Sequence, residues 1–519
     1  MRFRLIVLLL FSLTLSVYPQ EKIVRDKRDY KLLLLINVDQ LRSDFLFEFM
    51  DLYSDSGFKR LLSSGKVYSN AYYAFEQVDR ASSMATLMTG TNPYVNGIVA
   101  ETWLDRSTLR LVGCVEDSKQ TGLYTNSCVS PSKLRAITIT DEMKVATRGK
   151  SQVCVIAPDC ETAVMIGGHN ADAVLWKNND TGYWCSSSYY GEFPSWATEM
   201  NKKVVERSSA WEPFYPTVLY DNFGELPQES FNYSFNGKND IRSYKTSACM
   251  NDEINEMAIA CLRSGSIGLD NVTDFLSVTY YGGNYDSQPM ENRPIEIQDI
   301  YTRLDNNIAK LLNEIDRRIG LENVLISLTS TGYVVEGDTD NNELYRISSG
   351  YVQMDRVAAL LNVYLGAIYG KAQYVESYHN SQLYMNRKLI ETMQLDNHDV
   401  VSNAVEFLKS LDGVEDVFTI YRLGGMLSPE LQLAKNGYNP VGSGDLWLRL
   451  MPGWRLVEDE LLVSRELYRS PVMFPIIIYG GGVDASIVEK MTPANVLATD
   501  MARILRVRRP NDNSLRVFE

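Results

Sequence analysis

The sequence contains little histidine: His169, His379 and His398 are the only three among 519 residues. A catalytic site built on several zinc–imidazole bonds would need nearly all of them in one place. Basic residues are also outnumbered, because 51 Lys and Arg face 65 Asp and Glu and give a formal net charge of −14. Nucleic acids and anionic membrane surfaces bind clustered Lys and Arg, so we expect neither as a partner.

Long apolar runs are missing after the N-terminus, where Arg2 and Arg4 precede an apolar segment at residues 5–15. A basic start followed by a short apolar segment is typical of a secretory signal peptide and is too short for a comfortable membrane span. We therefore predict a Sec-type signal peptide at residues 1–20. The protein is then periplasmic or secreted, with no stable membrane span in its mature chain. An N-terminal anchor helix is the alternative interpretation.

Paired cysteine spacing is missing as well. The seven cysteines are an odd number and none stands in a C-x-x-C arrangement, so a zinc site of thiolates is not expected. In an exported protein disulfides are one possibility, and burial as small apolar side chains is the other. The cysteines are Cys114, Cys128, Cys154, Cys160, Cys185, Cys249 and Cys261.

Short apolar runs separated by helical patterns predict an α/β fold. Residues 295–316 carry apolar side chains at helical spacing and predict a long amphipathic helix. Runs that fit buried strands of a parallel-rich sheet lie at residues 31–38, 152–157, 274–281, 324–328 and 472–479. Ligand sites in such sheets lie beyond the carboxyl ends of the strands.

Two stretches interrupt this alternation and are predicted to be insertions that form a cap region. Residues 105–250 include a loop-rich part with many Tyr, Trp, Ser and Asn. Residues 345–465 contain alternating patterns such as Leu446-Trp447-Leu448-Arg449-Leu450 and predict a small separate sheet.

Several motifs of this sequence resemble motifs of a known protein family. Residues 32–46 (LLLLINVDQLRSDFL), 88–93 (MTGTNP), 168–174 (GHNADAV) and 436–440 (NGYNP) are similar to motifs of the alkaline phosphatase superfamily. The similarity is to its type I phosphodiesterase/nucleotide pyrophosphatase branch, close to the bacterial phosphate-irrepressible alkaline phosphatases. The resemblance covers nearly the whole mature chain and implies a parallel-rich sheet sandwiched by helices.

The resemblance also implies two zinc ions and a Thr or Ser nucleophile, and the residues at those positions differ from the family pattern. At the position of the family's first zinc ligand this sequence keeps an aspartate, Asp39. Amide, hydroxyl and thioether groups are poor zinc ligands beside carboxylate and imidazole. We therefore expect no zinc and no other cofactor. The other former ligand positions hold Asn284, Gln288, Thr331, Gly332 and Met473.

The positions that the family uses for catalysis differ too. The nucleophile position falls on Arg80, and the position of an Asn that holds a phosphoryl oxygen falls on Glu101. The Lys and Arg that bind phosphate in the bacterial branch correspond to Asp159 and Glu161, which would repel phosphate and are expected to form a solvated acidic rim.

Arg80 and Asp39 each allow two interpretations. The Arg80 guanidinium could occupy the space of the missing zinc and neutralise Asp39 and Glu101, or it could be an exposed residue at a helix start. Asp39 could be a leftover metal ligand, or it could cap a helix or pair with Arg80.

These differences lead us to predict a pseudophosphatase that is not an enzyme and serves as a binding, scaffold or regulatory component. Its partner would be another exported or envelope protein. The alternative is a phosphoric mono- or diester hydrolase with a rebuilt site, using Ser82 or Ser83 and a metal held by Asp39, Glu101 and Asp286. A third interpretation is a metal-free pocket lined by Arg80 and the aromatic residues of the first insertion.

Overall fold

The computed structural model describes most of the chain after residue 29. The predicted signal peptide at residues 1–20 lies outside the described residues. The described ranges are 30–204, 208–221, 230–236, 240–288, 293–336, 349–425, 428–457 and 468–511.

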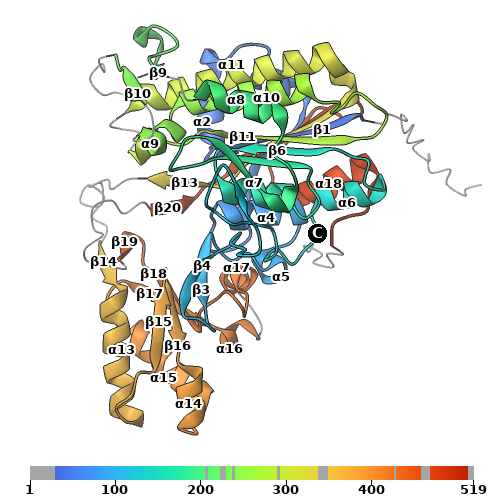
Figure 1. The fold of residues 1–519 in the computed structure, drawn as a ribbon. Coiled ribbons are helices and arrows are strands. Elements are labelled where there is room, and N and C mark those ends of the chain that lie inside the picture. Colours follow the sequence, from blue (N-terminus) through green and yellow to red (C-terminus); the bar gives the residue numbers. More distant parts are fainter. Residues whose placement is uncertain are drawn as a thin grey trace, which may run out of the picture.

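The core of the fold is an 11-stranded sheet (Figure 1). At its centre β1 (Leu32–Asp39) runs parallel to β11 (Asp274–Tyr281) and to β12 (Val324–Ser330), and β6 (Val153–Ala157) continues the parallel part beside β11. The α/β class and the parallel-rich centre are therefore confirmed. β21 (Phe474–Tyr479) differs, because it pairs with β12 in the antiparallel sense.

The sheet extends on both sides of this centre. The strand order is β22-β2-β21-β12-β1-β11-β6-β7-β8-β5, and β23 pairs with β2. These outer strands are β2 (Lys66–Tyr72), β5 (Gly122–Leu123), β7 (Ala173–Lys177), β8 (Trp184–Ser187), β22 (Ser486–Val488) and β23 (Thr492–Pro493).

Helices cover both faces of the sheet because its central strands are apolar on both faces. All of β1 is buried, and its alternate side chains enter two different apolar clusters. One cluster includes α10 (Ala248–Ser264) and α11 (Pro294–Ile319). The other includes α4 (Arg80–Thr89), α7 (Cys160–Gly167) and α18 (Val496–Leu505), and Figure 1 shows these two helix layers on opposite sides.

A small subdomain hangs from one end of the molecule (Figure 1). Its sheet has the order β15 (Val375–His379), β16 (Gln382–Met385), β18 (Leu446–Leu450) and β17 (Val414–Thr419). It packs with α13 (Met354–Tyr369) and α15 (Asn397–Lys409) around an apolar cluster of its own. The structure thus contains the small sheet predicted within residues 345–465. The range predicted as the first insertion, 105–250, also holds β6, β7 and β8 of the central sheet.

The remaining elements are short or peripheral. The helices are α2 (Ser43–Glu48), α3 (Phe58–Ser64), α5 (Pro93–Asn96), α6 (Ile139–Ala146), α8 (Ser195–Val204), α9 (Ile241–Lys245), α14 (Arg387–Thr392), α16 (Ile420–Leu423) and α17 (Pro429–Gly437). The strands are β3 (Thr102–Asp105), β4 (Arg110–Gly113), β9 (Ser208–Trp211), β10 (Tyr233–Asn236), β13 (Tyr333–Glu336), β14 (Gly350–Gln353), β19 (Trp454–Val457) and β20 (Tyr468–Pro471).

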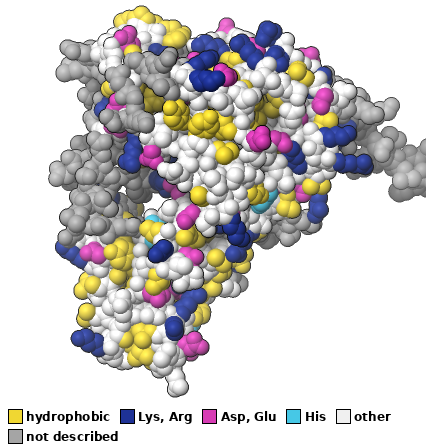
Figure 2. Space-filling model, in the orientation of Figure 1, with side chains coloured by type: hydrophobic (Ala, Val, Ile, Leu, Met, Phe, Trp, Pro, Cys, Tyr) yellow, Lys and Arg dark blue, Asp and Glu magenta, His cyan; other side chains and the backbone are white. Residues whose placement is uncertain are grey.

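The surface agrees with the charge balance of the sequence. On the face shown in Figure 2, Lys and Arg are interspersed with acidic and apolar side chains rather than gathered into one basic patch. Within the described residues, no helix has both the length and the apolar character needed to cross a membrane.

Candidate functional site

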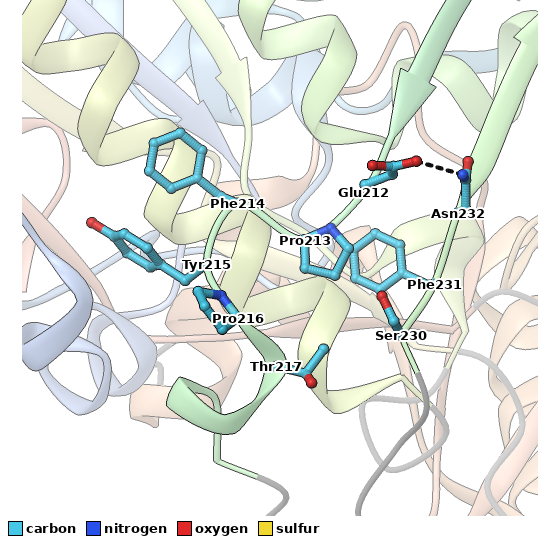
Figure 3. Close-up of a pocket in the computed structure, with 9 residues that line it drawn as sticks. All are labelled: Glu212, Pro213, Phe214, Tyr215, Pro216, Thr217, Ser230, Phe231 and Asn232. Atoms are coloured by element: carbon cyan, nitrogen blue, oxygen red, sulfur yellow. Dashed lines mark hydrogen bonds between the residues drawn. The ribbon is translucent and has the colours of Figure 1, made fainter.

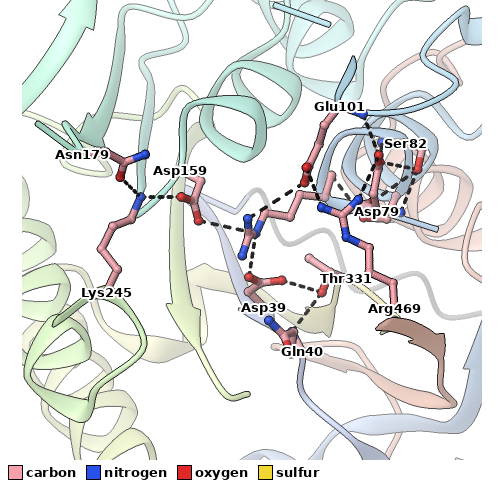
Figure 4. Close-up of polar contacts among 12 residues, drawn as sticks. Asp39, Gln40, Asp79, Ser82, Glu101, Asp159, Asn179, Lys245, Thr331 and Arg469 are labelled. Atoms are coloured by element: carbon pink, nitrogen blue, oxygen red, sulfur yellow. Dashed lines mark hydrogen bonds and ion pairs between the residues drawn. The ribbon is translucent and has the colours of Figure 1, made fainter. Parts of the chain in front are cut away.

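Several residues singled out in the sequence, namely Asp39, Glu101, Asp159 and Thr331, meet at one edge of the central sheet (Figure 4). Asp39 is the last residue of β1, and Thr331 follows the last residue of the neighbouring β12. Asp159 lies two residues after the end of β6. Because these strands are parallel, their carboxyl ends share an edge, which is where ligand sites of α/β sheets form.

Arg80, the first residue of α4, is bound by three acids from different parts of the chain. Its Nε lies 2.8 Å from Oδ2 of Asp39 and 3.5 Å from Oδ2 of Asp159, and its Nη1 lies 4.0 Å from Oε1 of Glu101. Burial alone would lower the pKa of Arg80, but the charges of Asp159 and Asp39 outweigh burial and raise the pKa well above its usual value. Arg80 is therefore permanently charged and paired with Asp39, as the first interpretation predicts, instead of being an exposed residue at a helix start.

The second oxygen of Asp39 is also occupied. Thr331 donates its hydroxyl to Oδ1 of Asp39 at 2.8 Å, and the same hydroxyl oxygen accepts the backbone N–H of Gln40 at 2.9 Å. Thr331, at a position where the resemblance implies a metal ligand, thus supports Asp39 by a hydrogen bond.

Asp159 is not part of a solvated rim, contrary to the sequence prediction. It forms an ion pair with Lys245 of α9, whose ammonium also donates to Oδ1 of Asn179 at 2.8 Å. Burial would raise the pKa of Asp159, but Arg80 and Lys245 outweigh burial and lower the pKa to about 2. For Glu161, burial together with the charges of Asp159 and Glu101 raises the pKa, and the charge of Arg80 offsets this only in part.

A second guanidinium completes the cluster. Nη2 of Arg469 lies 2.7 Å from Oε2 of Glu101, and its Nη1 lies 3.8 Å from Oδ2 of Asp79. The Arg469 guanidinium also lies 5.6 Å from the ring centroid of Tyr333, whose buried hydroxyl has no hydrogen-bond partner among the described residues. Arg469 was not predicted as a site residue, because no motif marks it and it arrives through the pairing of β13 with β20. Tyr333 directly follows the motif positions Thr331 and Gly332, but no role was predicted for it.

The serines that the alternative hydrolase interpretation named as nucleophiles have structural roles. Ser82 forms a capping box with Asp79 at the start of α4, and its Oγ donates to Oδ1 of Asp79 at 2.7 Å. Ser83 donates to the backbone oxygen of Arg80 at 3.2 Å. Both serines are fully buried.

The proposed hard-metal ligands do not form a site either. Asp286 lies against α9, where its backbone N–H donates to Oγ1 of Thr246 at 3.0 Å. In the part of the chain that the structure describes, no three His, Cys, Asp or Glu residues are grouped so that they could hold a metal ion.

The residues do not fit the zinc pair that the family resemblance implies. A Cβ atom added at Gly332 would lie 2.6 Å from the ring of Tyr73 and 2.7 Å from the ring of Phe474, so aromatic rings fill the space that a ligand side chain would need. Met473 is 40% exposed and carries only a thioether sulfur. Asp39 alone remains, and Arg80 already neutralises it.

The three histidines lie elsewhere. His169 contacts Asp141 of α6, with Nδ1 at 2.8 Å from Oδ2, and its other ring nitrogen lies 3.0 Å from the backbone oxygen of Leu134. His379 lies 3.0 Å from Oγ1 of Thr102, and the exposed His398 is near Asp399. His169 therefore has a structural role, because its ring joins α6 to the loop that contains Leu134.

The aromatic insertion, the part of residues 105–250 that is rich in Tyr and Trp, contains a separate cavity of about 650 Å³ (Figure 3). Arg80 is not among its lining residues, so this cavity does not support the third interpretation of one pocket shared by Arg80 and the insertion. The lining residues are Glu212, Pro213, Phe214, Tyr215, Pro216, Thr217, Ser230, Phe231 and Asn232.

Comparison with known proteins assigns the chain to a family. The model of the family described as type I phosphodiesterase/nucleotide pyrophosphatase matches residues 33–470. A protein named calcium-transporting ATPase from Myroides odoratus is 29% identical, over 96% of this chain and 95% of its own length. Alkaline phosphatase PhoV from Synechococcus elongatus is 27% identical, over 96% and 92% of the two chains.

A third relative has a solved structure. Alkaline phosphatase PafA from Elizabethkingia meningoseptica is 25% identical over 93% of this chain and 92% of its own. A crystal structure of wild-type PafA superposes with a TM-score of 0.79 at 23% identity, covering 93% of this chain and 97% of that one. This likeness confirms the predicted alkaline phosphatase-like fold.

The comparisons correct one prediction of the sequence analysis. We expected a protein that is not an enzyme, because most ligand positions and the nucleophile position differ from the family pattern. That expectation is wrong: relatives named alkaline phosphatases are 25% and 27% identical over nearly the full length, which points to an enzyme.

Proposed function

Because the chain belongs to the type I phosphodiesterase/nucleotide pyrophosphatase family, we propose that it hydrolyses phosphoric esters at the edge of the sheet where Arg80 lies. Its relatives PhoV and PafA are named alkaline phosphatases, which supports this class of reaction. The reaction class is that of the alternative interpretation, a phosphoric mono- or diester hydrolase, but without the rebuilt metal site. The catalytic residues differ from the serines and metal ligands considered there.

The state of Arg80 is the observation that carries this proposal. Its Nε donates to Asp39, whereas its two terminal nitrogens make no hydrogen bond to any described residue. The side chain is 24% exposed, so a ligand can reach it. Nη1 lies 4.0 Å from Oε1 of Glu101, an ion pair without a hydrogen bond, so both terminal nitrogens keep N–H groups to offer. Paired guanidinium N–H groups match the oxygens of a phosphoryl group and can hold two of them at once.

The charges around Arg80 favour diesters over monoesters. A phosphodiester carries one negative charge, whereas a monoester carries up to two and meets more repulsion from nearby carboxylates. Three cations face five carboxyl groups at this edge, namely Arg80, Lys245 and Arg469 against Asp39, Asp79, Glu101, Asp159 and Glu161.

The reaction we propose is direct attack by water. Because Ser82 and Ser83 are committed to hydrogen bonds in α4, the oxygen of a water molecule forms the new bond to phosphorus while the ester P–O bond breaks. Glu161, whose pKa is raised by burial and by its acidic neighbours, accepts the proton that the water loses, and the leaving alcohol takes a proton from solvent. Arg80 stabilises the charge that develops on the phosphoryl oxygens.

Hydrolysis of two aryl esters by the purified protein tests this proposal. We expect a higher kcat/KM for bis(p-nitrophenyl) phosphate than for p-nitrophenyl phosphate, and a loss on the order of 100-fold in Arg80→Met, which removes the stabilising charge. Arg80→Lys keeps the charge but loses the paired donors, and we expect a loss of about 10-fold.

Arg106→Met is the matched control for these variants. Arg106 is 20% exposed and pairs with Asp445 at 3.0 Å, so it resembles Arg80 in exposure and pairing but lies at a different place in the fold. We expect it to keep the hydrolysis rate. Absence of ester hydrolysis in the parent protein, or full activity in Arg80→Met, would contradict the proposal.

We also propose that the protein acts outside the cytoplasm. The basic start and short apolar segment within residues 1–20 support export through a signal peptide.

A further inference from the structure

We infer that Arg80 is a built-in cation that replaces bound metal at this site, so that the protein neither holds zinc nor needs it. The inference deepens the proposed function, on which its catalytic consequence rests. Its structural basis is the contacts of Arg80.

The Arg80 guanidinium already supplies the positive charge that a metal ion would supply. Asp39 is 1% exposed, and a buried carboxylate without a cation is strongly unfavourable. Arg80 lies 2.8 Å from Asp39 and also pairs with Asp159 and Glu101. One covalently attached cation therefore serves three acids that come from three separate segments of the chain.

A zinc ion at Asp39 would have to displace the Arg80 guanidinium. Arginine does not lose its proton in proteins, so the guanidinium cannot become neutral to make room. A divalent ion bound to Asp39 would lie beside that positive charge and be repelled by it. The hydrogen bond from Thr331 to the other oxygen of Asp39 would also be weakened.

Even with Arg80 displaced, the surrounding residues would form a poor set of zinc ligands. Tyr73 and Phe474 fill the space around Gly332, so no side chain fits there. The remaining acids have cations of their own: Asp159 pairs with Lys245, and Glu101 pairs with Arg469.

Metal content tests the inference directly. The full-length mature protein is dialysed against zinc chloride and then against buffer, and its zinc and manganese are measured by plasma mass spectrometry. We expect about 0.1 equivalents of metal or less, because a zinc site needs three or four good ligands. One or two equivalents of tightly held zinc would overturn the inference.

Thermal unfolding gives a second readout that does not depend on activity. A metal that binds only the folded protein raises its midpoint of unfolding, and a chelator lowers it. We expect shifts of less than about 1 °C in the parent protein with either EDTA or zinc. A rise of several degrees on addition of zinc would contradict a built-in cation.

The Arg80→Met variant sharpens this comparison. It leaves Asp39, Asp159 and Glu101 facing one another without the shared cation, so we expect a lower midpoint that added zinc or manganese partly restores. In Arg106→Met, Asp445 keeps its second partner Arg387, and we expect no restoration by metal. Equal responses of both variants to metal would contradict the assignment to Arg80.

Hydrolysis in the presence of EDTA separates this inference from the proposed function. Metal-free protein that hydrolyses esters in EDTA supports both. Metal-free protein without any hydrolysis supports the inference and contradicts the proposed function. Zinc-loaded protein whose hydrolysis stops in EDTA contradicts the inference of a built-in cation and supports ester hydrolysis as the function.

Discussion

At the scale of single residues, Asp39 shows how a hydrogen bond and an ion pair share one buried carboxylate. Arg80 binds one of its oxygens and Thr331 donates to the other. Thr331 is fully buried, and its oxygen also accepts the N–H of Gln40. The Thr331 hydroxyl therefore links the ends of two neighbouring parallel strands.

Replacing Thr331 by Val should destabilise the protein. The change removes the hydroxyl that serves Asp39 and Gln40 and leaves buried polar groups unpaired, which costs about 1–3 kcal/mol. Urea denaturation measures the free energy of unfolding. Thr329→Val is the matched control, because the buried Thr329 hydroxyl has no hydrogen-bond partner among the described residues and its loss should be nearly neutral. Equal losses in both variants would show that the Thr331 hydrogen bonds do not matter.

The raised pKa of Glu161 predicts a pH dependence of hydrolysis. A general base must be ionised, so kcat/KM should rise with pH through the raised pKa of Glu161 and level off above it. Glu161→Gln should lower the rate on the order of 100-fold and remove this rise. The pH profile of kcat/KM is the measurement, and Glu192→Gln, which alters an exposed acid, should leave the profile unchanged. An unchanged profile in Glu161→Gln would exclude Glu161 as the base.

At the scale of elements, α11 does more than cover the sheet. Its buried Asp299 accepts hydrogen bonds from Nε1 of Trp211 at 2.6 Å and from the hydroxyl of Tyr220 at 2.7 Å. It also accepts from Nε of Arg303 one turn further along the same helix, at 2.8 Å. One carboxylate thus fastens the aromatic insertion to the helix layer.

Asp299→Asn should loosen this attachment. The amide loses the charge and turns an N–H group toward donors, and breaking a buried network of this kind costs about 3 kcal/mol. Urea denaturation followed by tryptophan fluorescence reports the loss, since Trp211 is fully buried beside Asp299. Asp316→Asn on the exposed side of the same helix should change stability by no more than about 0.5 kcal/mol. A similar loss in both variants would contradict the attachment.

At the scale of the whole molecule, the site is assembled from distant parts of the chain. Asp39, Arg80 and Asp159 come from the main sheet and its helices, and Lys245 comes from the region before α10. Arg469 arrives from β20, which reaches the site through its pairing with β13. The small subdomain has its own apolar core.

The N-terminal segment predicts the location of the whole molecule. Expressed with residues 1–20 in place, the protein should appear in the periplasmic fraction or the medium, with a mass that shows cleavage near residue 20. Leu8→Arg places a charge within the apolar segment and should retain the uncleaved chain in the cytoplasm, because the apolar segment is what the export machinery binds. Cell fractionation and intact mass measurement check both outcomes. Cytoplasmic parent protein with residues 1–20 intact would contradict export.

The sequence by itself determined the fold class, the main strands of the central sheet and the long helix predicted at 295–316, because their apolar patterns reflect local burial. It also marked Asp39, Arg80, Glu101 and Asp159 by their place in family-like motifs. It misplaced Asp159 on a solvated rim, since a sequence does not show that Lys245 approaches it.

Only the tertiary structure decided how the site is balanced. Whether a charged residue is solvated or paired depends on which distant segments meet it, and residues far apart in sequence carry no mutual signal. Arg469 and Tyr333 come together through strand pairing, and Arg80 reaches Asp39 because α4 begins beside the end of β1. The packing of the sheet edge therefore gives each acid its partner, and the chemistry of the site follows from those partners.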